Sequence, residues 1–535
     1  MELTGDGAYQ LIKQAYGICK EEGLEYSGVY FCFRQSVYDT QDDEHGRDPA
    51  MTLLAYIRRG TGTYRGWVGV ARKLHDLLLG EGVYGVSVEI ADPRFEDNLS
   101  LYACYPTDII CPVWRDLVPE IIAQVDTTGV NTIGCFRIGL NDTGRSDCAP
   151  TVLLGVDYRV QRDWKSVRET VVHVLDRYNL SSVAVLIRKD SGKPSLSAAG
   201  FRNLERTSLG PAACRPDPSL GSSLSAHGVD TQDAMGMFTL GGWVELRNPE
   251  TGEWVPLALT CSHCCFPREE GLSAADREVL RTWKQEGVRT GDPNAARLLS
   301  MDAPCYRDIT AGVDAKESTM ARSKADKVYQ RVEAARAQGE FVLPGDKAKW
   351  KTASRILEAL EKDRDSMKSF VQNGQHVLGN VFAASGIREA RSTDDANKLS
   401  VRDWALVQPK SGRSAGDNAV NPTLAETKKV HKIGRVSGLT HGWYSALQSC
   451  VLENETKDGH TVARKTWEHV VAKPSGVFLK LGDSGSLLFN DSGDVLGILF
   501  GASERGDIAY FTATRDLLQD IRSITGVLEI RMKQE

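Results

Sequence analysis

The chain has 535 residues, of which 41% are hydrophobic and 25% are charged, a composition typical of globular proteins rather than fibrous or disordered ones. This length accommodates about two to four domains. The 65 Lys and Arg residues are outnumbered by 71 Asp and Glu residues, and no long basic run occurs, so a nucleic-acid partner is not expected.

The sequence shows no signal for a membrane or for secretion. No segment approaches the roughly 18 consecutive apolar residues of a membrane-spanning helix. The opening MELTGDGAYQLIKQ lacks the basic region and the apolar stretch of a secretory signal. The 12 cysteines are scattered over a chain large enough to build its core without disulfides, so we expect mostly free thiols. We therefore predict a cytoplasmic protein.

The first 190 residues contain two copies of one α/β pattern. In each copy a strand-like run is followed by an amphipathic helical pattern and a second strand-like run. These segments are 52–57, 67–79 and 86–90, and then 151–156, 164–175 and 183–187. A further helix and strand precede each copy, so each unit has the order αββαβ.

The two copies have the same internal register, because Trp67 is as far from Trp164 as Val86 is from Val183. We place the repeats at about 1–92 and 108–190, within a duplicated α/β domain over 1–205. Paired units of this kind usually share one sheet or pack face to face. The domain has no glycine-rich phosphate loop, metal-ligand cluster or nucleophile motif, which favours a recognition or regulatory role.

The composition then changes twice. Residues 206–232 are rich in Gly, Pro, Ser and Ala, which predicts a linker. Short strand-like runs separated by glycine turns follow over 233–535 and predict an all-β barrel or sandwich. Within it, apolar residues recur at heptad spacing between 318 and 373, on either side of GEFVLPGDK. We expect an inserted α-helical hairpin there.

Three motifs in the β region carry chemistry. GDSG at 482–485 precedes an apolar run, and a serine hydroxyl becomes a nucleophile only beside a base and oxyanion donors. LALTCSHCC at 257–265 places His263 at the end of an apolar strand. RDWALVQP at 402–409 places Asp403 at the start of one, whereas the nearby Asp394 and Asp395 lie in a polar loop.

These motifs, with IGRVSGLTHG at 433–442, resemble those of the trypsin-like serine peptidases over roughly 230–530. The pattern is most similar to intracellular fungal, viral and bacterial members with GDSGS. The resemblance implies a double β-barrel with His263 as general base, Asp403 as its orienting carboxylate and Ser484 as nucleophile. It also implies that the N–H groups of Gly482 and Ser484 form the oxyanion hole.

The sequence departs from the family in two respects. Trypsin-type zymogens are activated when a new N-terminal Ile or Val pairs with the aspartate before the nucleophile, here Asp483, but no IVGG-like site precedes the first strand. The oxyanion hole is therefore built without cleavage, or another part of the chain regulates it. Phe478 occupies the position that floors the substrate pocket, so a preference for Arg or Lys is not expected. We also assign Phe500 and Gly501 to this pocket.

Other interpretations stay open. GDSG can be an ordinary β-turn, and an intact triad sequence can belong to an inactive peptidase fold that acts as a scaffold or sensor. Cys261, His263 and Cys264 have ligand-like chemistry, but structural zinc sites normally need a second closely spaced pair, so we predict no metal and no cofactor. The expected partners are a protein or peptide substrate and a regulatory protein that binds the N-terminal domain or the helical hairpin.

Overall fold

The computed structural model describes residues 5–34, 49–58, 65–93, 99–141, 143–157, 159–190, 208–228, 236–267, 269, 271–416, 418, 429–457 and 460–533. The chain separates into two compact units. The first comprises Met1–Ser100 with Ile138–Cys148, and the second comprises Leu101–Arg137 with Ala149–Glu535. This division falls inside the region that we expected to form one α/β domain over 1–205.

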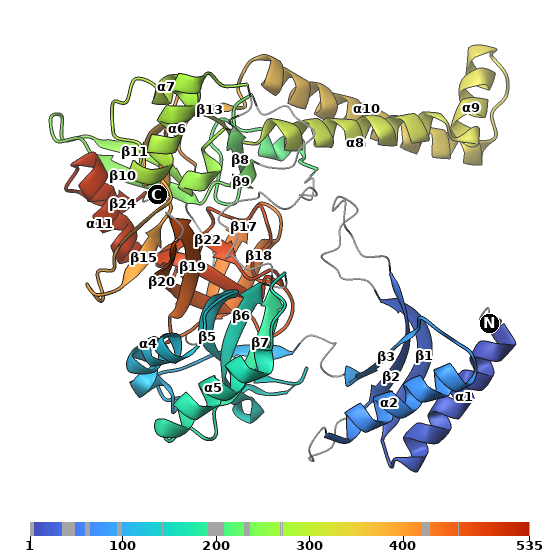
Figure 1. Ribbon diagram of the computed structural model, residues 1–535. Coiled ribbons are helices and arrows are strands. Elements are labelled where there is room, and N and C mark those ends of the chain that lie inside the picture. Colours follow the sequence, from blue (N-terminus) through green and yellow to red (C-terminus); the bar gives the residue numbers. More distant parts are fainter. Residues whose placement is uncertain are drawn as a thin grey trace. The chain divides into compact units, whose positions relative to one another are not determined.

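The first copy of the α/β pattern forms a small sheet with its own core (Figure 1). Its elements are α1 (Gly5–Glu21), β1 (Tyr26–Arg34), β2 (Ala50–Ile57), α2 (Arg65–Gly80) and β3 (Ser87–Ala91). β1 and β2 are antiparallel, and β2 and β3 are parallel. Leu11 of α1 and Leu74 of α2 are buried with Leu53 of β2, because each helix turns an apolar stripe toward the sheet.

The second copy has the same element order. Its elements are α4 (Trp114–Gln124), β5 (Val130–Gly139), β6 (Ala149–Asp157), α5 (Trp164–Arg177) and β7 (Ala184–Asp190), with β4 (Ser100–Ala103), η1 (Cys111–Val113) and η2 (Arg145–Asp147) beside them. β6 and β7 are parallel, as β2 and β3 are in the first copy.

The strands of the two copies lie in different sheets of the described chain, so the two copies do not share one sheet. β5 pairs instead with β19 (Ser449–Lys457) of the C-terminal region. The Trp114 indole N–H donates to the carbonyl of Gln448 (2.8 Å), and Leu447 and Trp467 join the hydrophobic core of the second copy. The apolar surface that this copy leaves uncovered is thus buried by the C-terminal region.

The segment expected as a linker over 206–232 is partly structured. Pro211–Ala213 forms a short helix, η3, and Ser223–Ala226 forms a buried strand, β8. β8 pairs with β9 (Met237–Thr239) and β12 (Ser300–Asp302). The small residues that suggested a linker fit here because this strand is packed closely from both sides. Residues 229–235 lie outside the described part of the chain.

An eight-stranded sheet and a two-stranded sheet carry the predicted histidine and aspartate motifs. In the larger sheet the described strands follow the order β24, β10, β11, β16, β13, β12, β8, β9. Besides β8, β9 and β12, this sheet contains β10 (Gly242–Arg247), β11 (Trp254–Thr260), β13 (Val377–Ala384), β16 (Ala405–Pro409) and β24 (Ile530–Met532). β14 (Arg388–Arg391) and β15 (Leu399–Arg402) form the two-stranded sheet.

The strands around the GDSG motif form a closed ring. Neighbours in the order β18, β17, β21, β22, β23, β20 are paired, and β18 also pairs with β20. These strands are β17 (Lys429–Gly434), β18 (Gly438–Tyr444), β20 (His460–Ala472), β21 (Leu487–Asn490), β22 (Val495–Ala502) and β23 (Ile508–Ala513). β20 continues to β19, which connects the ring to the second α/β copy.

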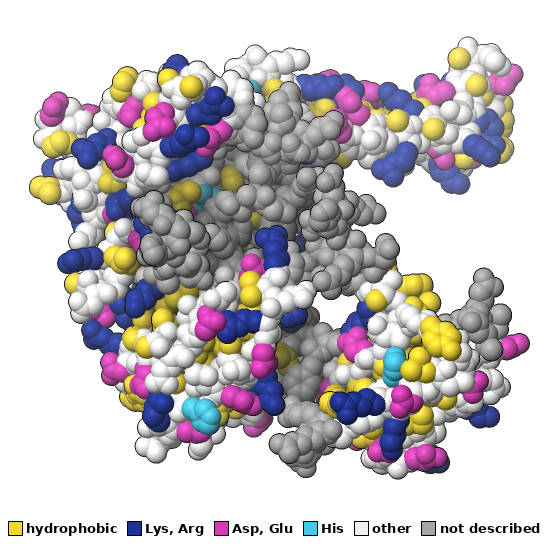
Figure 2. Space-filling model, viewed as in Figure 1, with side chains coloured by type: hydrophobic (Ala, Val, Ile, Leu, Met, Phe, Trp, Pro, Cys, Tyr) yellow, Lys and Arg dark blue, Asp and Glu magenta, His cyan; other side chains and the backbone are white. Residues whose placement is uncertain are grey.

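The helical insertion is longer than expected and its first helix is broken. α8 (Tyr306–Lys324) begins before residue 318, α9 (Lys327–Ala337) follows it, and α10 (Pro344–Gln372) returns alongside α8 (Figure 1). The predicted heptad pattern runs across this break, where Asp326 caps α9 by accepting from the N–H groups of Val328 and Tyr329. Ion pairs such as Lys316 with Asp363 join α8 to α10, and Figure 2 shows acidic and basic side chains interspersed along the insertion.

Three shorter helices complete the second unit. They are α6 (Ala274–Glu286), α7 (Ala295–Leu298) and α11 (Thr514–Thr525). All 12 cysteines lie in the described residues and none forms a disulfide, in agreement with the prediction of free thiols. In the described ranges, no helix combines the length and apolar character needed to cross a bilayer.

Candidate active site

His263 lies where the buried strand β11 ends. The strand is followed by the single-turn helix η4 (Ser262–Cys264), so the imidazole is held at the end of a central strand of the eight-stranded sheet. The His263 side chain is 5% exposed. Its imidazole and the ring of Phe238 pack edge to face, with ring centroids 5.3 Å apart. The predicted base is therefore fixed by packing on a rigid element.

Asp403 is the carboxylate that contacts His263. It is completely buried between β15 and β16, and it accepts hydrogen bonds from both the backbone N–H (2.9 Å) and Nδ1 of His263. The alternative carboxylates point to other partners, Asp394 to Arg515 and Asp395 to Arg115. The bond to Nδ1 fixes the neutral tautomer with its lone pair on Nε2, the atom that accepts a proton in general-base catalysis.

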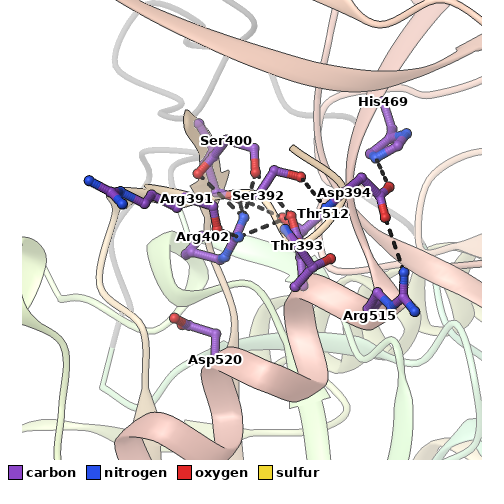
Figure 3. A network of polar contacts seen from close by, with 12 residues as sticks. Arg391, Ser392, Thr393, Asp394, Ser400, Arg402, His469, Thr512, Arg515 and Asp520 are labelled. Atoms are coloured by element: carbon purple, nitrogen blue, oxygen red, sulfur yellow. Dashed lines mark hydrogen bonds and ion pairs between the residues drawn. The ribbon is translucent and has the colours of Figure 1, made fainter. Parts of the chain in front are cut away.

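Buried polar contacts hold the strand before Asp403. The guanidinium of Arg402 donates to Ser400 Oγ (2.6 Å) and to the carbonyl of Arg391 (2.8 Å), and it forms an ion pair with Asp516 (2.9 Å). Figure 3 shows the Arg402 side chain among these segments. On the other side of Asp403, the Trp404 backbone N–H donates to Ser385 Oγ (2.8 Å). Both neighbours of the aspartate are therefore anchored, which limits how far its carboxylate can move.

The electrostatic environment favours a charged imidazole. Burial alone lowers the pKa of His263, but the charge of Asp403 and its hydrogen bond act in the opposite direction and raise the pKa of His263 to about 10. A general base must be neutral to accept a proton. The free base would therefore form mainly at alkaline pH.

Ser484 lies against the turn that carries His263. Its carbonyl accepts from the N–H of Thr239 (3.1 Å) and lies 3.9 Å from Cys264 Sγ. Among the contacts of the described residues, Nε2 of His263 is near Cys264 Sγ (3.6 Å), and no hydrogen bond joins it to Ser484 Oγ. The structure thus brings the histidine and aspartate into direct contact and the serine backbone beside them. In unliganded enzymes catalytic hydrogen bonds are often long.

The turn around Ser484 has two backbone donors without an acceptor among the described residues. The N–H groups of Asp483, Gly485 and Ser486 donate to the carbonyls of Lys480, Leu499 and Asp483. Within the described chain, those of Gly482 and Ser484 donate to no protein acceptor. Gly485 has φ +92°, and a Cβ there would lie 2.5 Å from the carbonyl oxygen of Thr239. This position therefore requires glycine.

A buried ion pair, which sequence reasoning missed, holds Asp483. The ammonium of Lys432 lies 2.7 Å from its carboxylate, and both side chains are 0% exposed. The backbone N–H groups of Val436 and Ser437 and that of Lys480 also donate to the carboxylate. Burial alone raises the pKa of Asp483, but Lys432 and these donors outweigh it and lower the pKa below its ordinary value. The strand that carries Lys432, KVHKIG, contains a second lysine and a histidine and gave no signal of a buried charge.

The three residues assigned to the substrate pocket are part of the packed strands. Phe478 is 0% exposed and lies in a hydrophobic core with Leu488 and Phe511. Phe500 is 1% exposed and sits at an irregularity in the pairing of β22 with β23, and Gly501 pairs with Tyr510. Their contacts are those of core residues, and their assignment to a substrate pocket stays a prediction.

The thiols near His263 form the group of metal-ligand type that the sequence offered as an alternative interpretation. Ligand atoms of Cys261, His263 and Cys264 lie within 4.8 Å of one another. Burial raises the pKa of Cys264 to about 11, which keeps the thiol protonated at neutral pH. A metal here would also occupy the imidazole that Asp403 orients. The arrangement therefore favours a histidine used as a base.

Comparison with known proteins does not identify a family for this chain. No protein-family model matches it, and no curated protein matches its sequence. Similar solved structures include a Nocardiopsis protease, with a TM-score of 0.24 and 11% identity, where the match covers 59% of this chain and 100% of that one. The Rv3671c protease of M. tuberculosis in its active form has a TM-score of 0.17 and 15% identity, covering 30% of this chain and 78% of that one.

Proposed function

We propose that this chain is a serine endopeptidase whose second unit contains a trypsin-like double β-barrel. The observation that carries the proposal is the buried His263–Asp403 pair beside a GDSG turn. A buried carboxylate bonded to Nδ1 holds the imidazole in the tautomer and orientation that a general base needs, and it stabilises the charged form. The closed ring of strands around the GDSG motif and the eight-stranded sheet correspond to the two barrels in this proposal.

The proposed reaction is acyl transfer. Ser484 Oγ attacks the carbonyl carbon of the scissile peptide bond while Nε2 of His263 takes its proton, and Asp403 stabilises the imidazolium that forms. The tetrahedral oxyanion is bound by the N–H groups of Gly482 and Ser484, which have no protein acceptor within the described residues. His263 then protonates the leaving amine, and a water molecule hydrolyses the acyl-enzyme by the same route.

Lys432 gives this proposal a way to work without zymogen cleavage. In trypsin-type zymogens a new N-terminal ammonium pairs with the aspartate before the nucleophile. Here the Lys432 ammonium already pairs with Asp483 in the intact chain. We therefore propose that the oxyanion turn is formed in the uncleaved protein.

The helical insertion is the proposed regulatory element. Asp308 in the first turn of α8 forms a buried bidentate ion pair with Arg435, with N–O distances of 2.6 and 2.5 Å. The guanidinium of Arg435 also lies close to Gly482. A Cβ built on that glycine would be 3.1 Å from this guanidinium. Movement of α8 would therefore reach the oxyanion turn through one side chain. A protein that binds the insertion or the N-terminal unit is the expected regulator.

Hydrolysis of a mixture of synthetic peptides tests the function. The wild-type chain should cleave internal peptide bonds, with no preference for Arg or Lys before the cut because Phe478 supplies no carboxylate. Ser484→Ala should cleave none, at unchanged circular dichroism. Equal cleavage by both proteins would mean a contaminating peptidase and would contradict the proposal. A folded wild-type chain that cleaves nothing would favour the scaffold alternative.

A further inference from the structure

His227, Asp302 and His376 converge at one edge of the eight-stranded sheet, and the proposed peptidase chemistry uses none of them. Each offers one ligand atom, and these atoms all lie within 4.8 Å of one another. Nδ1 of His227 is 2.8 Å from Asp302 Oδ1, and the centroids of the two imidazole rings are 5.8 Å apart. The cluster joins residues that are far apart in the sequence.

Backbone pairing holds the three residues in place. His227 follows β8, Asp302 ends β12 and His376 precedes β13, and β12 pairs with both of the other strands. The N–H of His227 donates to the carbonyl of Ser300 (2.7 Å), and the N–H of Ala303 donates to that of His376 (2.9 Å). The side chains are thus presented by three adjacent strands and not by a mobile loop.

One nitrogen of His376 has no partner among the described residues. His376 is 9% exposed, and its Nδ1 is buried and forms no hydrogen bond. Buried polar atoms in folded proteins nearly always have a partner. The carboxylate of Asp302 is also buried, with 2% exposure. A cation bound between them would satisfy the nitrogen and neutralise the carboxylate.

We propose that His227, Asp302 and His376 bind a divalent transition-metal ion, with Zn²⁺ as the expected occupant. Two imidazole nitrogens and one carboxylate oxygen form a donor set that suits Zn²⁺. Three protein ligands leave a fourth position for water, and the side chain of His227 is 47% exposed, so solvent can reach the site. The present 2.8 Å contact between His227 and Asp302 would open slightly as both bind the ion.

The site lies at the base of the helical insertion. Asp302 shortly precedes α8, and His376 shortly follows α10. The guanidinium of Arg413 already braces the two segments, donating to the carbonyl of Ala303 (2.6 Å) and to that of Gln375. A metal ion would add β8 to this connection and fix both ends of the insertion to the sheet.

Zn²⁺ titration of the full-length Ser484→Ala chain, after removal of metal with EDTA, tests the site without self-cleavage. We expect one tight site by calorimetry. His376→Gln and the half-exposed His227→Gln should each weaken Zn²⁺ binding at least about 100-fold, because each removes a ligand. His431→Gln is the matched control, since it removes a histidine paired with an aspartate (His431 to Asp491, 2.7 Å) elsewhere in the chain. The Zn²⁺ affinity of His431→Gln should equal that of the parent.

Two further measurements separate the outcomes. Co²⁺ bound at this site should give visible bands without the thiolate charge-transfer absorption that ligation by Cys261 or Cys264 would produce. Zn²⁺ should slow hydrogen exchange at both ends of the insertion and leave β17 unchanged. Absence of Zn²⁺ binding, a thiolate band, or an affinity in His227→Gln or His376→Gln equal to that of the parent would each overturn the proposal. None of these readouts depends on peptidase activity.

Discussion

Replacing Lys432 tests how the oxyanion turn is held. Lys432→Met keeps the volume of the side chain but leaves the carboxylate of Asp483 buried without a cation. Removing one partner of a buried ion pair typically destabilises a protein by about 3–5 kcal/mol. Asp483 retains hydrogen bonds from neighbouring backbone N–H groups, so we expect the lower end, about 3 kcal/mol.

This loss should appear in both stability and activity. Urea unfolding should show the lower free energy of unfolding. If the penalty falls on the turn alone, about 3 kcal/mol reduces the population of the formed turn by about 100-fold. The rate at which a fluorophosphonate probe labels Ser484 should fall by the same factor. Lys432→Met with Asp483→Asn removes both charges and should recover most of the stability. Lys429→Met, on the same strand, is the control. Wild-type stability and labelling in Lys432→Met would refute the role of the pair.

Three further predictions concern other buried charges. In NMR spectra of the inactive nucleophile variant, His263 should titrate well above 6.5, and Asp403→Asn should bring its pKa below 6.5 because burial then dominates; titration near 6.5 in both would contradict this. Burial raises the pKa of Glu468 to about 7, so its favourable contribution is lost as pH rises from about 4.5 through 7. Glu468→Gln should therefore raise the free energy of unfolding by up to about 3 kcal/mol at pH 8 and leave it unchanged at pH 4; equal shifts would contradict this. Asp308→Asn should slow active-site labelling while the exposed Asp314→Asn on the same helix does not, and equal rates would exclude coupling through α8.

Local patterns in the sequence predicted much of the element order. Alternating and helical spacing located the αββαβ order of both α/β copies, because each element has an apolar face toward its own sheet. The strand with which the second copy pairs outside its own unit was not predictable. The second copy joins β19 through Trp114 and Leu447, contacts between residues far apart in the chain. Residues 223–226 were taken as linker because small polar residues gave no strand signal.

The candidate site divides in the same way. His263 and Asp403 could be proposed because each stands at the end or start of an apolar strand, and the structure brings them into contact. Lys432 could not be proposed as the partner of Asp483, because nothing near it in the sequence distinguishes a buried ammonium from an exposed one. The cluster of His227, Asp302 and His376 was also missed, since its spacing matches no metal motif and only the sheet unites it.

Labelling with a fluorophosphonate probe tests the central claim most directly. The probe reacts with serines that are activated as nucleophiles. We expect the folded wild-type chain to be labelled at Ser484, as located by mass spectrometry, with labelling abolished in Ser484→Ala and strongly reduced in His263→Ala. A folded wild-type chain that remains unlabelled, or label that persists in Ser484→Ala, would contradict the assignment of this site as a serine peptidase.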